Sequence, residues 1–281
     1  MRTSRRLQNV LIGAAAVLVA GTQLLPDHEQ QGPVMATATA LLSGKPLTVA
    51  AAAPAESASI EAGTAVNALT KDAVSALSDK VRKLSSSQAL EDAFHAYFAF
   101  KSEHPDEVKK PLLYFVDYGL SSTEKRGYVF NMDDLSIVDG PFTVAHGRSS
   151  SASRFGVPTK FSNSFGSNAT SLGLYVTKSL YTFHGHSAGH PYSSVGVRLD
   201  GVSTGFNDNA YARKVVAHGA PYVTPTRAGR SEGCPAMEPS RAQRLLPELA
   251  NGAMVFLFAP NSKWLAGDPW IGADGRTLAE G

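Results

Sequence analysis

Hydrophobic positions recur along the chain with two different periods, and the period changes near Pro111. Upstream of it, apolar residues stand at helical spacing in one set over 66–84 and a second over 90–98. A run of serines at 85–87 separates the two sets, so the pattern predicts two helices. The aromatic stripe of the second set is typical of core packing rather than of a binding surface.

Beyond Pro111 the pattern changes to short runs of β-branched and aromatic residues with turn residues between them. A short helix is predicted at 241–249, started by Ser240 and stopped by Gly252. A glycine-rich segment over 184–190 is interpreted as a loop before the next strand. The expected fold class is therefore mainly β with a few helices. The predicted strands are 112–118, 127–132, 142–146, 172–177, 195–199 and 253–258.

The N-terminal residues 1–26 combine a basic start with an apolar stretch. That stretch is shorter than the roughly 20 apolar residues of a comfortable membrane span, so a signal peptide and an uncleaved N-terminal anchor both stay open. Either one exports the rest of the chain to the periplasm or cell envelope. An anchor would also attach the protein to the membrane.

The rest of the 281 residues divides by composition into a spacer, a helical segment and a larger domain. Residues 27–64 are rich in Ala, Ser, Thr and Pro and predict a flexible spacer. The helical residues 65–110 are expected to pack on a catalytic domain over 111–281. The formal charge is only +2, and no run of Lys and Arg is interleaved with aromatic residues. These features exclude a nucleic-acid partner.

Cysteine usage is informative in an exported chain. A domain stapled by disulfides carries an even number of cysteines, whereas this chain has one, Cys234. A lone thiol is either buried and inert or kept for its chemistry. Gly233 and Pro235 flank Cys234 and argue against a buried strand position.

The residues around Cys234 supply the parts that thiolate attack requires, namely a base for the thiol proton and donors for a developing oxyanion. Gly233 permits a sharp turn, and Arg230 adds positive charge nearby. His218 stands sixteen residues upstream at the end of an apolar run, where it can face the loop that carries the thiol. We therefore expect a thiol pKa below the roughly 8.5 of free cysteine.

A longer set of motifs resembles one known family. The His-Gly pair at 218–219 and the Ser-x-Gly-Cys sequence at 231–234 are similar to the active-site signature of L,D-transpeptidases. The resemblance is closest to the murein L,D-transpeptidase catalytic domain family and covers 112 to about 258. The segments that carry it are 144–147, 161–163, 171–175, 197–201, 207–210, 215–222 and 230–236.

The resemblance implies a cysteine-dependent acyl transfer on peptidoglycan stem peptides, with no cofactor. Cys234 would form a thioester, and His218 would accept its proton. Ser231 and the backbone N–H groups of Gly233 and Cys234 would orient the catalytic groups and hold the oxyanion. An amine acceptor gives a transpeptidase, and water gives a carboxypeptidase.

Substrate-binding residues are less well marked in the sequence. Many relatives carry Arg two residues after the Gly-Cys pair, where this chain has Ala236, so Arg230 is the candidate substitute. A polar segment near the substrate groove would contribute Tyr181, His186 and Tyr192. His146 belongs to a second His-Gly pair, and the sequence leaves open whether its role is structural or substrate-facing.

Two alternatives from other classes stay open. His184, His186 and His190 form a cluster that suggests a metal-binding hydrolase, although no His-Glu-x-x-His spacing accompanies them. A catalytically silent envelope protein that binds peptidoglycan or a partner would share the fold. The intact set of predicted catalytic residues argues against the silent protein.

Overall fold

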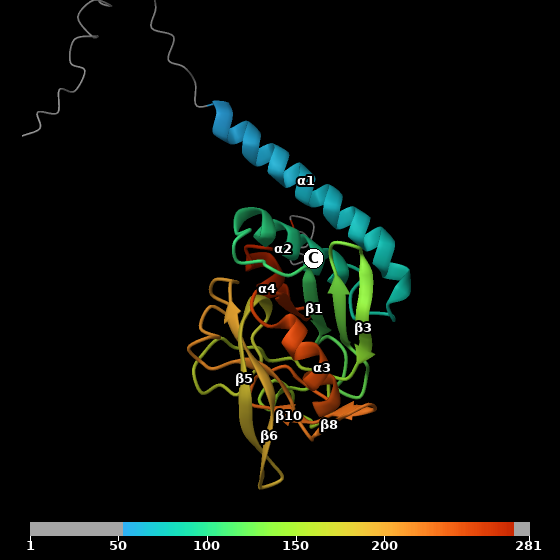
Figure 1. Ribbon diagram of the computed structural model, residues 1–281, viewed down its shortest axis with the longest axis vertical. Coiled ribbons are helices and arrows are strands. Elements are labelled where there is room, and N and C mark those ends of the chain that lie inside the picture. Colours follow the sequence, from blue (N-terminus) through green and yellow to red (C-terminus); the bar gives the residue numbers. More distant parts are fainter. Residues whose placement is uncertain (1–52, 273–281) are drawn as a thin grey trace, which may run out of the picture. The chain divides into compact units, whose positions relative to one another are not determined.

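The computed structural model describes residues 53–272, with side chains from residue 61 onward (Figure 1). The predicted signal peptide or anchor and most of the predicted spacer lie outside the described residues. No helix in the described part of the chain combines the length and apolar character that a membrane span requires.

Strands form the centre of the described chain. They are β1 (Leu112–Asp117), β2 (Gly127–Asn131), β3 (Ser136–Phe142), β4 (His146–Gly147), β5 (Gly173–Ser187), β6 (His190–Gly201), β7 (Val216–Gly219), β8 (Val223–Thr224), β9 (Arg227–Ala228), β10 (Arg230–Ser231), β11 (Ala236–Met237) and β12 (Met254–Phe258). Eight of these strands form one sheet in the order β11-β7-β6-β5-β12-β1-β2-β3. The pairs β1–β12 and β11–β7 are parallel, and the other pairs in this sheet are antiparallel. Two smaller sheets pair β10 with β4 and β8 with β9.

The described residues also form α-helices and one short 3-10 turn. They are α1 (Ala53–Leu77), the 3-10 turn η2 (Ser78–Lys80), α2 (Ala89–Glu103), α3 (Pro239–Leu249) and α4 (Ser262–Gly267). The two predicted helices correspond to α1 and α2, which pack on each other. α2 also contacts β1 and β12, and α3 contacts β5, β6 and β7. Every residue of β12 is buried, as expected of a strand whose two faces are both covered.

The sequence of α3 explains where this helix begins and which face it buries. Pro239 occupies the first turn, where a missing N–H costs nothing, and the N-cap is Glu238, so the predicted start at Ser240 is wrong by two residues. The Ser240 hydroxyl donates instead to the Glu238 carboxylate at 2.8 Å. The buried residues recur at helical spacing and face the sheet, and they are Ala242, Leu245, Leu246 and Leu249.

Other predicted segments also differ from the structure. The strand predicted over 142–146 is wrong, because β3 ends at Phe142 and β4 begins at His146. The loop predicted over 184–190 is also wrong, because β5 and β6 pair along this segment and turn only at Ala188 and Gly189. The resulting hairpin extends beyond the neighbouring strands in Figure 1. Glycine and histidine composition suggested a loop, but cross-strand pairing overrides that local preference.

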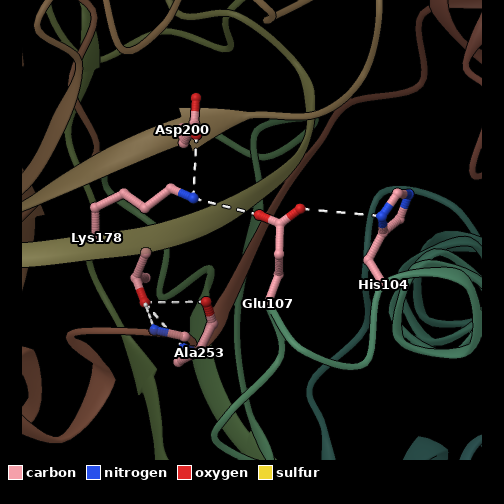
Figure 2. Close-up of polar contacts among 7 residues, drawn as sticks. His104, Glu107, Lys178, Asp200 and Ala253 are labelled. Carbon is pink, nitrogen blue, oxygen red and sulfur yellow. Dashed lines mark hydrogen bonds and ion pairs between the residues drawn. The ribbon is translucent and has the colours of Figure 1, made fainter. Parts of the chain in front are cut away.

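Ionic contacts tie the segment after α2 to the sheet (Figure 2). Glu107 Oε2 lies 3.3 Å from Lys178 Nζ on β5, and the same ammonium lies 3.2 Å from Asp200 Oδ2 on β6. On its other side, Glu107 Oε1 lies 3.9 Å from His104 Nδ1. All four side chains are partly exposed, so each contact contributes about 1 kcal/mol or less and mainly sets position.

A carboxyl group stands in α2 where little solvent reaches it. Asp92 is 3% exposed, and burial together with the nearby Glu91 and Asp268 raises its pKa to about 7. An Asp in an unfolded chain has a pKa of about 3.9. The folded protein therefore keeps a proton that the unfolded chain releases, and folding stability is lost as the pH rises from about 4 to about 7.

We expect Asp92→Asn to remove most of this loss. The free energy of unfolding of the wild type should fall by on the order of 2 kcal/mol between about pH 5 and pH 8, and that of the variant should fall by less. Urea denaturation at the two pH values measures both. The exposed Asp106→Asn serves as the matched control, and an unchanged pH dependence in Asp92→Asn would contradict the assignment.

Candidate active site

Cys234 lies on a short connection between two strands that are each anchored elsewhere. β10 pairs in parallel with β4, and β11 pairs in parallel with β7. The second pairing aligns Ala236 with His218, whose N–H also donates to Pro235 O at 3.3 Å. The backbone of Pro235, the residue after Cys234, is thereby held against the backbone of His218.

Hydrogen bonds fix the turn around the thiol. Ser231 Oγ donates to Cys234 O at 2.7 Å and accepts from the Gly233 N–H at 3.2 Å, while Thr170 Oγ1 donates to Gly233 O at 3.1 Å. Gly233 has a φ of +126°, and a Cβ there would lie 2.9 Å from Ala169 O. The turn therefore requires glycine. The Gly233 N–H, which was predicted to hold an oxyanion, donates to Ser231 Oγ instead.

His218 is arranged as a neutral base. Its Nδ1 lies 3.0 Å from Gly219 O, and because a carbonyl oxygen can only accept, Nδ1 carries the proton and Nε2 keeps a lone pair. The ring stacks on Phe183 with centroids 4.0 Å apart. His218 is 2% exposed, and burial lowers its pKa to about 4 against the opposing effect of the hydrogen bond to Gly219.

Burial also has the largest effect on the pKa of the Cys234 thiol. Cys234 keeps some exposed surface, but the protein packs closely around its sulfur and raises the thiol pKa to about 11. A backbone hydrogen bond from Val216 and the guanidinium of Arg213 act in the opposite direction, and Glu232 adds to the rise. The expected pKa below that of free cysteine is therefore wrong, because desolvation of the thiolate outweighs the donors around it. At neutral pH both Cys234 and His218 are uncharged.

Both groups line one groove with a volume of about 640 Å³. Of the predicted substrate-binding residues, His186, Tyr192 and Arg230 line it as well. Tyr181 is not among the lining residues, and its ring lies 4.7 Å from the Arg198 guanidinium. Lining residues that sequence reasoning missed include Arg148, Phe165, Phe183, Arg213, Lys214 and Tyr222.

The histidine cluster lies on the β5–β6 hairpin. His184 and His186 occupy alternate positions on β5 and line the groove, while His190 begins β6. His184 Nδ1 lies 2.9 Å from Ser193 Oγ. Within residues 53–272, no group of three or more His, Cys, Asp or Glu side chains is placed to hold a metal ion.

His146, in the second His-Gly pair, has a structural environment. It is fully buried, and its Nδ1 accepts from Arg126 Nη2 at 2.9 Å. Burial, and then the charges of Arg126 and Arg230, lower its pKa to about 3. Arg126 is itself fully buried and also donates to Val144 O at 2.7 Å. This cluster supports β4, the strand that anchors β10.

The sequence over residues 81–258 matches the L,D-transpeptidase catalytic domain family. The match covers more than half of the chain, and the chain belongs to this family. The family and the mainly β fold class predicted from the sequence are thereby confirmed. No curated protein matches the sequence.

Solved structures of L,D-transpeptidases are similar at low sequence identity. The enzyme from Mycobacterium smegmatis is 15% identical, with 53% of this chain and 59% of that chain covered and a TM-score of 0.31. L,D-transpeptidase 3 from Mycobacterium tuberculosis is 14% identical, with 53% and 61% covered and a TM-score of 0.32. The enzyme from Stackebrandtia nassauensis is 16% identical, with 62% and 67% covered and a TM-score of 0.33. The chain thus spans about three-fifths of the length of the first of these structures.

The raised pKa predicts slow alkylation of Cys234 at neutral pH. Iodoacetamide reacts with the thiolate, and a thiol with a pKa of about 11 holds on the order of a few hundred-fold less thiolate at about pH 7 than free cysteine does. The labelling rate of the native protein should therefore rise continuously to about pH 11. Urea-denatured protein is the control and should titrate like free cysteine. A native midpoint below about 8.5 would show an activated thiolate, and no labelling at any pH would show an inert thiol.

Proposed function

We propose that this protein is a cysteine-dependent L,D-transpeptidase of the cell envelope that acts on peptidoglycan stem peptides without a cofactor. Membership of the L,D-transpeptidase catalytic domain family supports the reaction class. One observation carries the proposal for the residues. The Cys234 thiol lines the same groove as a His218 imidazole whose Nε2 keeps its lone pair.

Because both groups are neutral at rest, proton transfer accompanies attack in this proposal. As Cys234 sulfur adds to the carbonyl carbon of an L,D-configured bond, its proton passes to His218 Nε2 and the Cys234 N–H stabilises the oxyanion. Collapse of the tetrahedral intermediate breaks the C–N bond, and the imidazolium gives its proton to the leaving amine. Ser231 holds the Cys234 turn through its two hydrogen bonds.

The second half of the reaction releases the thioester. An acceptor amine attacks the thioester carbonyl, His218 Nε2 takes the amine proton, and the same proton returns to the departing sulfur. The new amide bond completes a cross-link. Water in place of the amine would give a carboxypeptidase product by the same proton path.

We assign substrate contact to the groove residues Arg230, His186 and Tyr192. Arg230 is exposed beside the thiol, and its guanidinium can receive a carboxylate of the stem peptide. Tyr181 lies outside the groove lining and would meet only a substrate that extends along the hairpin.

The raised thiol pKa is also the observation that favours the alternative of a catalytically silent, peptidoglycan-binding envelope protein. An inert cysteine needs neither an opening to a groove nor a neighbouring base. Cys234 lines the groove together with His218. Its turn also requires Gly233, because a Cβ at that position would lie too close to Ala169 O. We therefore favour the enzyme.

We further propose that residues 1–26 direct export, that the spacer predicted over 27–64 ends where α1 begins at Ala53, and that 65–110 pack on the catalytic residues 111–281. The contacts of α2 with β1 and β12 support the last part. A reporter fused after residue 64 that stayed in the cytoplasm would contradict export.

Incubation with purified disaccharide-tetrapeptide muropeptides tests the proposed function directly. The wild type should release the terminal D-amino acid, form cross-linked or trimmed products, and show a transient mass increase equal to one donor less the released amino acid. Cys234→Ala should lose product and adduct together. Cys234→Ser should retain less than about 1% of the turnover, because a serine hydroxyl is far less acidic than a thiol.

The exposed Ser102→Ala is the matched control and should react like the wild type. Turnover that persists in Cys234→Ala would remove this residue from the mechanism. A wild type that binds muropeptides without product or adduct would establish the silent alternative.

A further inference from the structure

Arg213 lies beside the Cys234 turn and holds one wall of the groove. Its Nη1 donates to Ser162 O at 2.9 Å and to Ser171 Oγ at 3.3 Å, and its Nη2 donates to Ser167 Oγ at 3.1 Å and to Ala169 O at 3.0 Å. All four acceptors belong to the single segment 162–171. One guanidinium therefore fixes this segment at both ends.

The fixed segment belongs to the site. Its residues Phe165, Gly166 and Asn168 line the groove. Ala169 O, which accepts from Arg213, is also the atom that a Cβ on Gly233 would approach to 2.9 Å. The clamp by Arg213 thus sets the surface against which the Cys234 turn packs.

The guanidinium of Arg213 lies close to the Cys234 turn, because a Cβ on Gly233 would lie 3.7 Å from Arg213 Nη2. Its hydrogen bonds within the described residues all go to neutral oxygens, so no carboxylate there neutralises it. Its charge stabilises the Cys234 thiolate, and in turn Cys234 stabilises the charged guanidinium.

Of the charged side chains that shift the thiol pKa, only Glu232 accompanies Arg213, and it acts in the opposite direction. Glu232 opposes the thiolate, and its carboxylate lies 3.6 Å from the Arg148 guanidinium at the exposed rim. The tyrosines near the sulfur have hydroxyl pKa values raised by burial and stay neutral during the reaction. These tyrosines are Tyr118, Tyr175, Tyr181, Tyr192 and Tyr222.

We propose that Arg213 is a positioning residue of the transpeptidase site that clamps the 162–171 wall and supplies the positive charge that stabilises the sulfur as its proton leaves. The inference rests on the proposed role of Cys234 as the nucleophile. An arginine suits both tasks, because its planar fork reaches several acceptors at once and stays charged when partly buried. A lysine would keep the charge but lose the fork.

Two substitutions separate the charge from the clamp. Arg213→Gln removes the charge, and the iodoacetamide labelling rate of Cys234 at about pH 9 should fall roughly three- to tenfold. Arg213→Lys keeps the charge and should label within about twofold of the wild type. Both variants should speed amide hydrogen exchange across 162–171, because both break the clamp. The exposed Arg227→Gln is the matched control and should change neither measurement.

Labelling does not depend on muropeptides, so this test can fail while the proposed function stands. Equally, the muropeptide test can fail while the labelling result stands. A wild-type labelling profile in folded Arg213→Gln would overturn the charge role. If Arg213→Gln does not fold, Arg213→Lys decides: a tenfold loss of labelling would overturn the charge role, and near wild-type labelling would support it. Unchanged exchange across 162–171 in a folded variant would overturn the clamp.

Discussion

The parallel pairing of β11 with β7 is the constraint on which the site depends. It sets Ala236 opposite His218, and residues 232–235 must bridge from there to β10, which β4 holds in place. The bridge is short, so it passes against Ala169 O at a position where only glycine fits. Buried Arg126 hydrogen-bonds to His146 and so supports β4. A displacement of about 1 Å at a reacting group can cost on the order of 100-fold in rate. Any reaction at this site therefore requires the anchored turn.

Burial is the second consequence of the same packing, and it sets the protonation of the pair. A desolvated thiolate and a desolvated imidazolium are both disfavoured, so Cys234 and His218 rest as a neutral pair. In the proposed mechanism the proton moves during attack, when the developing oxyanion and the charge of Arg213 compensate the charges that form. A resting thiol of this kind is protected against oxidants, because oxidation follows thiolate character.

Local patterns predicted what depends on local chemistry. The helical period before Pro111, the glycine before Cys234 and the strand that ends near His218 all follow from residues close in sequence. The β5–β6 hairpin was missed because its register depends on cross-strand partners that composition does not reveal. The predicted thiol pKa was wrong because the burial of the sulfur depends on the packing of the whole site. Arg213 gave no local signal, since its acceptors stand 42 to 51 residues away in the sequence.

The protonation of His218 tests the account most directly. Nitrogen NMR of the imidazole at about pH 7 distinguishes a neutral ring, with one protonated and one unprotonated nitrogen, from an imidazolium. The account predicts a neutral ring protonated at Nδ1, because Gly219 O accepts from that atom, both in the wild type and in Cys234→Ala. A doubly protonated ring in the wild type that becomes neutral in Cys234→Ala would show a preformed thiolate–imidazolium pair. That result would contradict the neutral resting pair on which the mechanism depends.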